Sequence, residues 1–258
     1  MGLMVPQYAM LEAPMAAYDD FAWFYHRYWN EEFHIAAFPI LERIWLPCVA
    51  EGARILDVCC GSGYLAGLLA ERGYRVTGFD ASPAMIDLAR RHAPGAQFEV
   101  SEASALRTRT KFDAAVSTFD SLNHILDPNE LAETFCSVAR VLKPGAPFAF
   151  DILLEAAYRT DWAENFTVVR DDHVLVISGS GFDFRTQLAH CRITMFRLID
   201  GVWKRSDTEV RERCYRAEEI DRALAEAGFG VPECYAAQDM GMEGQLGEGR
   251  VFYVVRKK

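Results

Sequence analysis

Residues 55–83 read ILDVCCGSGYLAGLLAERGYRVTGFDASP. An apolar run typical of a buried strand ends in a glycine-rich turn, and the apolar spacing that follows predicts a helix. A second apolar run, YRVTGF, then leads to Asp80. Glycines 61 and 63 let the backbone of the turn approach a ligand closely, and the free N–H groups at the start of the helix face the same place. The stretch therefore predicts a strand, a ligand-binding turn, a helix and a second strand.

The same alternation continues toward the C-terminus and predicts a doubly wound, mostly parallel sheet. The predicted helices end at glycines or begin at a capping residue, as at Gly73, Gly145 and Ser82-Pro83. Strands are predicted at 53–58, 74–79, 96–100, 112–118, 147–153, 230–238 and 250–256, and helices at 63–73, 83–93, 130–142 and 217–228.

Two regions break this rhythm. After Asp151 the sequence alternates with period two and has turn signals at Asp171-Asp172 and Asp200-Gly201, which predicts an antiparallel insertion of three or four strands after the fifth strand. Residues 18–46 carry aromatics at helical spacing and predict one or two helices, which either pack on the core or cover a ligand. We expect three parts: 1–50 as an N-terminal helical lid segment, 51–154 with 217–258 as the core, and 155–216 as the insertion.

Composition narrows the function classes. The chain has 258 residues, is 51% hydrophobic and carries a formal net charge of −10. Such a chain buries a large core, and its negative charge disfavours nucleic acid as a partner. The seven cysteines include no C-x-x-C pair, and the sequence has no secretory leader or apolar stretch of membrane-spanning length. We therefore expect a cytoplasmic protein that binds a small molecule and neither membrane nor metal.

The acids beside the turn distinguish between two cofactors. Asp80 closes the second strand, where a carboxylate can accept from both hydroxyls of a ribose. The pattern Gly61-x-Gly63-x-x-Ala66 also satisfies the dinucleotide fingerprint. However, Asp57 precedes the first glycine at the lip of the turn, where a carboxylate would repel a pyrophosphate and suits a cationic ammonium or sulfonium group. The acid favours a positively charged ligand over a nicotinamide dinucleotide.

The segment LDVCCGSG resembles the first motif of the class I S-adenosylmethionine-dependent methyltransferases, a strand ending in Asp followed by G-x-G. Later segments resemble family motifs in the same order: FDASPAMIDLAR, Glu102-Ala103, FDAAVSTFDSLNHI and LKPGAPFAFDIL. The resemblance covers residues 51–154 and, more loosely, 217–258. It implies a Rossmann-like, seven-stranded methyltransferase core with S-adenosyl-L-methionine as cofactor.

The resemblance also implies which residues contact the cofactor. Asp80 stands at the ribose position, Met85 where the family packs the adenine, and Glu102 where the family often has Asp. Two N-terminal tyrosines resemble those that relatives close over the cofactor. The full set of expected cofactor contacts is Tyr18, Tyr25, Asp57, Gly61, Gly63, Asp80, Ala81, Met85, Glu102, Ala103, Thr118 and Phe119.

Acceptor chemistry is expected at the carboxyl end of the fourth strand, because open α/β sheets bind ligands there. His124 is a candidate general base or a histidine that begins a helix. Asp120 is a candidate anchor for a basic substrate or the N-cap of the segment SLNHIL. The Asn-Pro-Pro-Tyr type motif of methylases that act on nucleic-acid bases is absent from STFDSLNH.

Several functions remain open at this point. The first is methyl transfer to a nitrogen or oxygen of a small metabolite by in-line displacement. The others are methylation of a protein, a catalytically silent binding module of the same fold, and a nicotinamide oxidoreductase. The resemblance suggests that the insertion at 155–216 defines specificity as a substrate cover or forms the contact of a homodimer.

Overall fold

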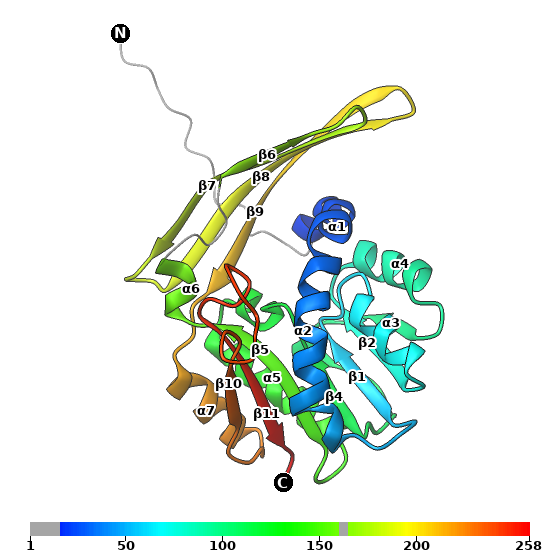
Figure 1. The fold of residues 1–258 in the computed structure, drawn as a ribbon, viewed down its shortest axis with the longest axis vertical. Coiled ribbons are helices and arrows are strands. Elements are labelled where there is room, and N and C mark those ends of the chain that lie inside the picture. The colour runs from blue at the N-terminus through cyan, green and yellow to red at the C-terminus, as the bar shows by residue number, and fades with distance from the viewer. Residues whose placement is uncertain (1–15, 160–164) are drawn as a thin grey trace.

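The structure, a computed structural model, describes residues 16–159 and 165–258, with the side chains of residues 16–18 outside the description (Figure 1). Its helices are α1 (Ala16–Tyr28), α2 (Asn30–Ile44), α3 (Tyr64–Glu71), α4 (Pro83–His92), α5 (Pro128–Val141), α6 (Glu155–Arg159) and α7 (Ala217–Glu226). Short 3-10 turns are η1 (Leu46–Cys48), η2 (Ala103–Ala105) and η3 (Ser121–His124).

The main sheet has seven strands in the order β10-β11-β5-β4-β1-β2-β3. Its parallel part is β1 (Arg54–Val58), β2 (Arg75–Asp80), β3 (Gln97–Val100), β4 (Ala114–Ser117) and β5 (Pro147–Leu153). The strands β10 (Glu233–Ala236) and β11 (Arg250–Arg256) extend this sheet in antiparallel fashion. The structure confirms the predicted doubly wound, mostly parallel sheet.

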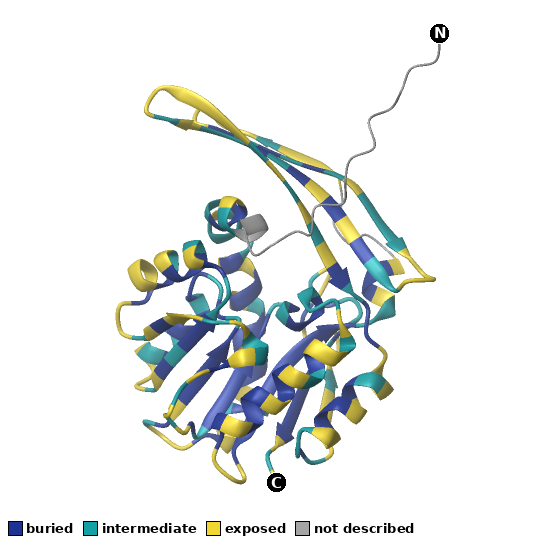
Figure 2. Cartoon of the chain, turned by 180° about the vertical axis from the view of Figure 1, so that it is seen from behind, coloured by how far each residue is buried: buried dark blue, intermediate teal, exposed yellow. Residues whose placement is uncertain are grey.

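Side chains alternate between the two faces of this sheet, as pleated strands require. Ile55 of β1 packs with α2, α3 and α4, whereas its neighbour Leu56 packs with α5 and α7. Figure 2 shows the buried residues gathered along the strands and on the sides of the helices that face them. Helices on both faces leave the carboxyl ends of β1, β2 and β4 free to build a site.

A second, four-stranded antiparallel sheet follows β5. It consists of β6 (Phe166–Val169), β7 (His173–Asp183), β8 (Leu188–Ile199) and β9 (Val202–Arg213), so the insertion contains four strands. Figure 1 shows it arching away from the main sheet over α1. Phe21 and Phe24 of α1 pack against Leu175, Ile177 and Ile193 of this sheet. Helix α1 also contacts α4. It therefore packs against both the insertion sheet and the layer of helices on the main sheet.

Single residues confirm the predicted starts and ends of helices. Gly73 and Gly145 adopt positive φ angles of 86° and 76°, and the Ser82 hydroxyl accepts from the Met85 N–H at 3.1 Å as the N-cap of α4. The strand predicted at 230–238 is shorter in the structure, where β10 begins at Glu233 and residues 237–241 form a turn. No helix in the described ranges is both long and apolar enough to cross a membrane.

Candidate active site

The turn after β1 (residues 57–63, hereafter the cofactor turn) is shaped by left-handed backbone. Gly61 and Gly63 have φ angles of 51° and 81°. A Cβ on Gly63 would lie 2.9 Å from the Ala89 Cβ, so the absence of a side chain lets α3 and α4 approach each other. A Cβ on Gly61 would lie 3.5 Å from the Tyr25 ring. The turn is therefore close-packed behind Gly63 and covered by Tyr25 at Gly61.

Asp80 ties the cofactor turn to the end of β2. Its carboxylate accepts from the Gly61 N–H at 2.8 Å and from the Ser82 N–H at 2.9 Å. Burial raises the pKa of Asp80, while these two N–H groups oppose that rise. Each carboxylate oxygen has a second lone pair, so Asp80 can still accept from a ligand such as a ribose.

Asp57 is a buried carboxyl group of this turn with one oxygen that lacks a hydrogen-bond partner among the described residues. The residue is 2% exposed, and the oxygen in question is Oδ2. Burial, and next the nearby Asp80, raise the pKa of Asp57 to about 8. A buried acceptor without a donor is costly, and a cation beside it would restore its ionised form. A positively charged ligand would therefore suit this residue, and its contact with the cofactor stays a prediction.

The other expected cofactor contacts occupy the same edge of the sheet. Ala81 is half-buried directly after β2, and Met85 is buried in the first turn of α4. Glu102 is exposed after β3, and Ala103 begins η2. The strands β2 and β3 are parallel neighbours, which brings these two pairs to adjacent strand ends.

Helix α1 is fastened to this edge by polar contacts. The Asp19 carboxylate accepts from the Ser82 hydroxyl at 2.5 Å and from the Ala84 N–H at 3.2 Å. On the cofactor turn, the Ser62 hydroxyl accepts from Asn30 Nδ2 at 2.6 Å and lies 2.9 Å from His26 Nδ1. Sequence reasoning missed these partners, which join segments far apart in the chain.

The two predicted lid tyrosines differ in what the structure describes. Tyr18 falls in the first turn of α1, and its side chain lies outside the described residues. Tyr25 is half-buried and tilts against the Phe119 ring with centroids 5.8 Å apart. Burial, and next Asp120 and Asp80, raise the Tyr25 pKa well above its ordinary value. Tyr25 thus lies between the cofactor turn and the end of β4.

The segment after β4 has unusual backbone geometry. Phe119 and Asp120 adopt φ angles of 64° and 47°, which non-glycine residues rarely do. The Asp151 carboxylate at the end of β5 accepts from both N–H groups, at 2.7 and 3.0 Å. Phe119 stacks on Phe33 at 4.2 Å, and Thr118 Oγ1 lies 3.3 Å from His34 Nε2. These contacts hold the strained segment in one conformation.

A buried arginine neutralises part of the charge here. Arg250 of β11 is 3% exposed, lies 2.7 Å from Asp120 Oδ1 and also pairs with Asp151. Burial raises the pKa of Asp151, and Arg250 opposes that rise. Burial alone would lower the pKa of Arg250, but the two aspartates hold it above its ordinary value. Asp120 precedes η3, but its side chain makes no capping hydrogen bond to that turn. Its carboxylate pairs with Arg250 instead.

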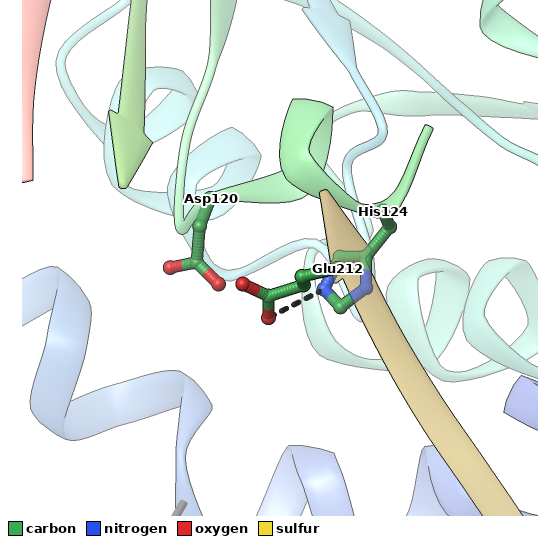
Figure 3. Close-up of side chains that lie close together, drawn as sticks. All are labelled: Asp120, His124 and Glu212. Carbon is green, nitrogen blue, oxygen red and sulfur yellow. Dashed lines mark ion pairs between the residues drawn. The ribbon is translucent and has the colours of Figure 1, made fainter. Parts of the chain in front are cut away.

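His124 and Glu212 complete the group. His124 Nδ1 lies 3.1 Å from the Arg211 carbonyl oxygen, and its Nε2 lies 3.6 Å from Glu212 Oε1 (Figure 3). Burial lowers the His124 pKa, against the opposing effect of Asp120. Glu212 is 3% exposed and accepts from the Tyr158 hydroxyl at 2.8 Å. Burial, and next Asp120, raise the Glu212 pKa well above its ordinary value.

We call Asp120, His124 and Glu212 the acceptor cluster. One possible ligand atom from each lies within 4.8 Å of the others, a spacing that suits a bound cation. The cluster opens on a cavity of about 220 Å³. Its walls come mainly from α1, the end of β4, the insertion sheet and the loop before β11: Phe21, Tyr25, Trp29, Phe119, Phe166, Ile177, Ile193, Val210, Leu246 and Arg250 among others.

Sequence reasoning placed Asp120 and His124 here but missed Asp151, Glu212 and Arg250. A signal existed for two of them. Asp151 lies on a buried strand near its carboxyl end, as Asp57 and Asp80 do. Glu212 occupies the inward-facing register of β9, between Val210 and the buried Cys214. Arg250 had no comparable signal in its own strand.

Comparisons with known proteins agree with this geometry. A family model described as "Methyltransferase domain" matches residues 55–145. A 109-residue match to the ubiquinone biosynthesis O-methyltransferase of Alkalilimnicola ehrlichii (strain ATCC BAA-1101 / DSM 17681 / MLHE-1) is 41% identical and covers 40% of this chain and 42% of that protein.

One solved structure and one relative match over almost the whole chain. The structure of an amino pentose methyltransferase from Micromonospora echinaspora with bound S-adenosylmethionine has a TM-score of 0.69 at 21% identity, covering 98% of this chain and all of that one, which supports the fold. A Geobacillus sp. (strain WCH70) protein named "Putative methyltransferase" is 30% identical over 251 residues, 93% of this chain and 99% of its own length. With that near-complete match, the chain belongs to the class I methyltransferases and is an enzyme that uses S-adenosylmethionine.

Proposed function

We propose that this enzyme transfers the methyl group of S-adenosylmethionine to a nitrogen or oxygen of a small metabolite by in-line displacement. The observation that carries the proposal is the cavity of about 220 Å³ that α1, the end of β4, the insertion sheet and the loop before β11 enclose. Tyr25 covers Gly61 of the turn and also lines this cavity. A space of that size suits a small acceptor better than a protein segment, which would need an open groove.

The cofactor supplies a methyl group already activated by the sulfonium charge, so the residues of the chain need only bind, orient and exclude water. In this proposal Asp57 balances the positive charge and Asp80 holds the ribose. Gly61 and Gly63 give the ligand room, and Ala81, Met85, Glu102 and Ala103 surround the adenosine. The segments predicted at 1–50 and 155–216, of which 1–15 and 160–164 lie outside the described residues, act as the lid and the substrate cover.

The names of relatives agree with a small acceptor. One similar protein is named for ubiquinone biosynthesis and another for an amino pentose, and both names refer to small molecules. The first name specifies an oxygen as the methylated atom, whereas the second names an amino sugar and no atom. The choice between nitrogen and oxygen has to come from the acceptor cluster itself.

A labelling experiment tests the proposal. Purified enzyme is incubated with methyl-tritiated S-adenosylmethionine and a bacterial extract separated into metabolites and proteins. We expect label in the metabolite fraction, and little with Asp80→Ala. Label confined to the protein fraction would contradict the small-molecule assignment. With a chiral methyl group on the cofactor, inversion of configuration is expected, and retention would contradict in-line displacement.

A further inference from the structure

The charges around the cavity do not balance. Three buried carboxyl groups meet there, from Asp120, Asp151 and Glu212, whereas Arg250 brings one guanidinium that pairs with the two aspartates. Glu212 accepts from the uncharged hydroxyl of Tyr158, and its carboxyl group also makes a hydrogen bond with that of Asp120, which adds no positive charge. Buried carboxylates need a positive partner or a proton. The place is therefore suited to a ligand that brings a positive charge.

The shape and lining of the cavity agree with a cationic ligand. Asp120, His124 and Glu212 all line it, and Figure 3 shows the two carboxyl groups and the imidazole turned toward one another. Aromatic rings from α1, from the residue after α1, from the segment after β4 and from β6 form much of the remaining wall, and ring faces attract cations. These rings are Phe21, Tyr25, Trp29, Phe119 and Phe166.

The chemistry of methyl transfer separates nitrogen from oxygen acceptors. A neutral amine gains a positive charge as it takes the methyl group, and the acceptor cluster would stabilise that charge. A hydroxyl must instead lose its proton before or during transfer. The resulting negative oxygen would lie beside Asp120 and Glu212, and like charges at short range repel. The cluster therefore favours nitrogen.

We propose that the acceptor is a small amine whose nitrogen lies between Asp120 and Glu212, with His124 as the group that removes its surplus proton. This inference rests on the proposed function. A C–N bond forms to the methyl carbon, and the S–C bond breaks with its electron pair left on sulfur. Before this attack the bound ammonium gives one proton to His124 Nε2, which frees the lone pair of its nitrogen, and the proton passes from there to solvent because the imidazole is 26% exposed.

The tautomer of His124 supports this role. Its Nδ1 lies at hydrogen-bond distance from the Arg211 carbonyl oxygen, which can only accept, so Nδ1 carries the hydrogen. The lone pair is then on Nε2, the atom that faces Glu212. A primary ammonium group has three N–H donors. Asp120, Glu212 and His124 Nε2 supply three acceptors for them.

The same three residues could hold a metal ion, but their surroundings favour an ammonium. The Arg250 guanidinium lies 2.7 Å from Asp120, and a divalent ion bound to that carboxylate would lie beside it. The Tyr158 hydroxyl donates a hydrogen bond to Glu212. An ammonium can donate a second hydrogen bond to the same carboxyl group and leave the bond from Tyr158 in place. An amine adds a single charge that can spread over the carboxylates and the aromatic walls.

A matched pair of probes tests the inference: benzylamine and benzyl alcohol, titrated by calorimetry into enzyme saturated with S-adenosylhomocysteine. We expect benzylamine to bind at least tenfold more tightly than benzyl alcohol. Glu212→Gln should abolish this preference, while Glu209→Gln, an exposed change on the same strand, should leave it intact. Tyr158→Phe keeps the carboxyl group and should keep the preference, which controls for loss of packing near Glu212.

Three results would overturn the inference: equal or tighter binding of benzyl alcohol, a preference for the amine that survives Glu212→Gln, or Mn²⁺ binding that displaces benzylamine and is lost in Glu212→Gln. The labelling experiment separates its failure from that of the proposed function. Label found in hydroxyl acceptors alone overturns the nitrogen assignment and leaves small-molecule methylation standing. Label found in proteins alone overturns the proposed function, whatever the probes show.

Discussion

The cofactor turn and the acceptor cluster are built in different ways. The turn comes from one short stretch, residues 57–63, and Asp80 on the adjacent strand completes it. The acceptor cluster and its arginine come from the end of β4, from η3, from the insertion and from the last strand. A site formed by contiguous residues can be recognised in sequence, and a site formed by distant segments appears only when the chain folds.

The two regions also differ in how their charge is balanced. Asp57 stands in the cofactor turn without a hydrogen-bond donor to Oδ2 in the described part of the chain. Asp120 and Asp151 share an arginine, and Glu212 remains beside them. In the proposed function Asp57 obtains its charge partner from the cofactor. The acceptor region, by which we mean the acceptor cluster with Asp151 and Arg250, also contains ion pairs of its own.

The largest expected effect follows from removing the shared arginine. Arg250→Met should lower the free energy of unfolding by about 3–5 kcal/mol, because it leaves two buried aspartates without their cation. Urea denaturation measures this change. Arg256→Met, an exposed position on the same strand, is the matched control and should change stability by less than about 0.5 kcal/mol. Similar losses in both variants would show that the ion pairs do not support the acceptor region.

The next largest effect concerns His124. His124→Ala should reduce turnover by about 100-fold, because a positioned proton acceptor contributes at least that much. Affinity for S-adenosylhomocysteine should stay close to that of the wild type, since His124 belongs to the acceptor region. A fully active variant would show that His124 takes no part in the reaction. A loss of cofactor affinity would show that the acceptor region also contributes to cofactor binding.

A smaller effect is expected at the cofactor turn. Asp80→Ala should weaken binding of S-adenosylhomocysteine more than tenfold, through loss of ribose hydrogen bonds of about 1.5–3 kcal/mol. Because Asp80 also accepts from Gly61 and Ser82, Asp80→Asn serves as the milder comparison. Calorimetry measures both. Unchanged affinity in Asp80→Ala would show that the ribose binds elsewhere.

The effect that is smallest per pH unit, although it accumulates across the whole pH window, is a pH dependence from Asp57. Its folded pKa of about 8 exceeds its ordinary value of 3.8, so between these values the folded state holds a proton that the unfolded state has lost. The free energy of unfolding should therefore fall as pH rises through this window, by at most about 1.4 kcal/mol per unit for one proton. Asp57→Asn should lack this part of the slope. Parallel pH profiles in urea denaturation would contradict the assignment.

The fold was largely predictable because its signals are local. Apolar runs, glycines at helix ends and the Ser82-Pro83 cap gave the strands and helices of the core, and turn residues at Asp171-Asp172 and Asp200-Gly201 marked the insertion. The cofactor turn followed from the spacing of Asp57 and the glycines. Its roles in binding stay predictions until a ligand is seen there.

The acceptor region was only half predictable, for physical reasons. Asp120 and His124 follow a strand end, so topology placed them near a ligand. Glu212 reaches the site because β9 packs against η3. Arg250 reaches it because β11 pairs with β5 in the observed register. The contacts of α1 through Asp19 and His26, and of α2 through Asn30, likewise depend on tertiary packing. The inward-facing register of Glu212 in β9 was visible in the sequence, but the partners in these contacts were not.

A crystal structure of the enzyme with S-adenosylhomocysteine would test most directly that the two regions meet at one reaction centre. The account predicts ribose hydroxyls within hydrogen-bond distance of Asp80, the amino-acid end beside Asp57, and the sulfur facing the cavity lined by Asp120, His124 and Glu212. A ribose bound away from Asp80, or a sulfur turned away from that cavity, would contradict it.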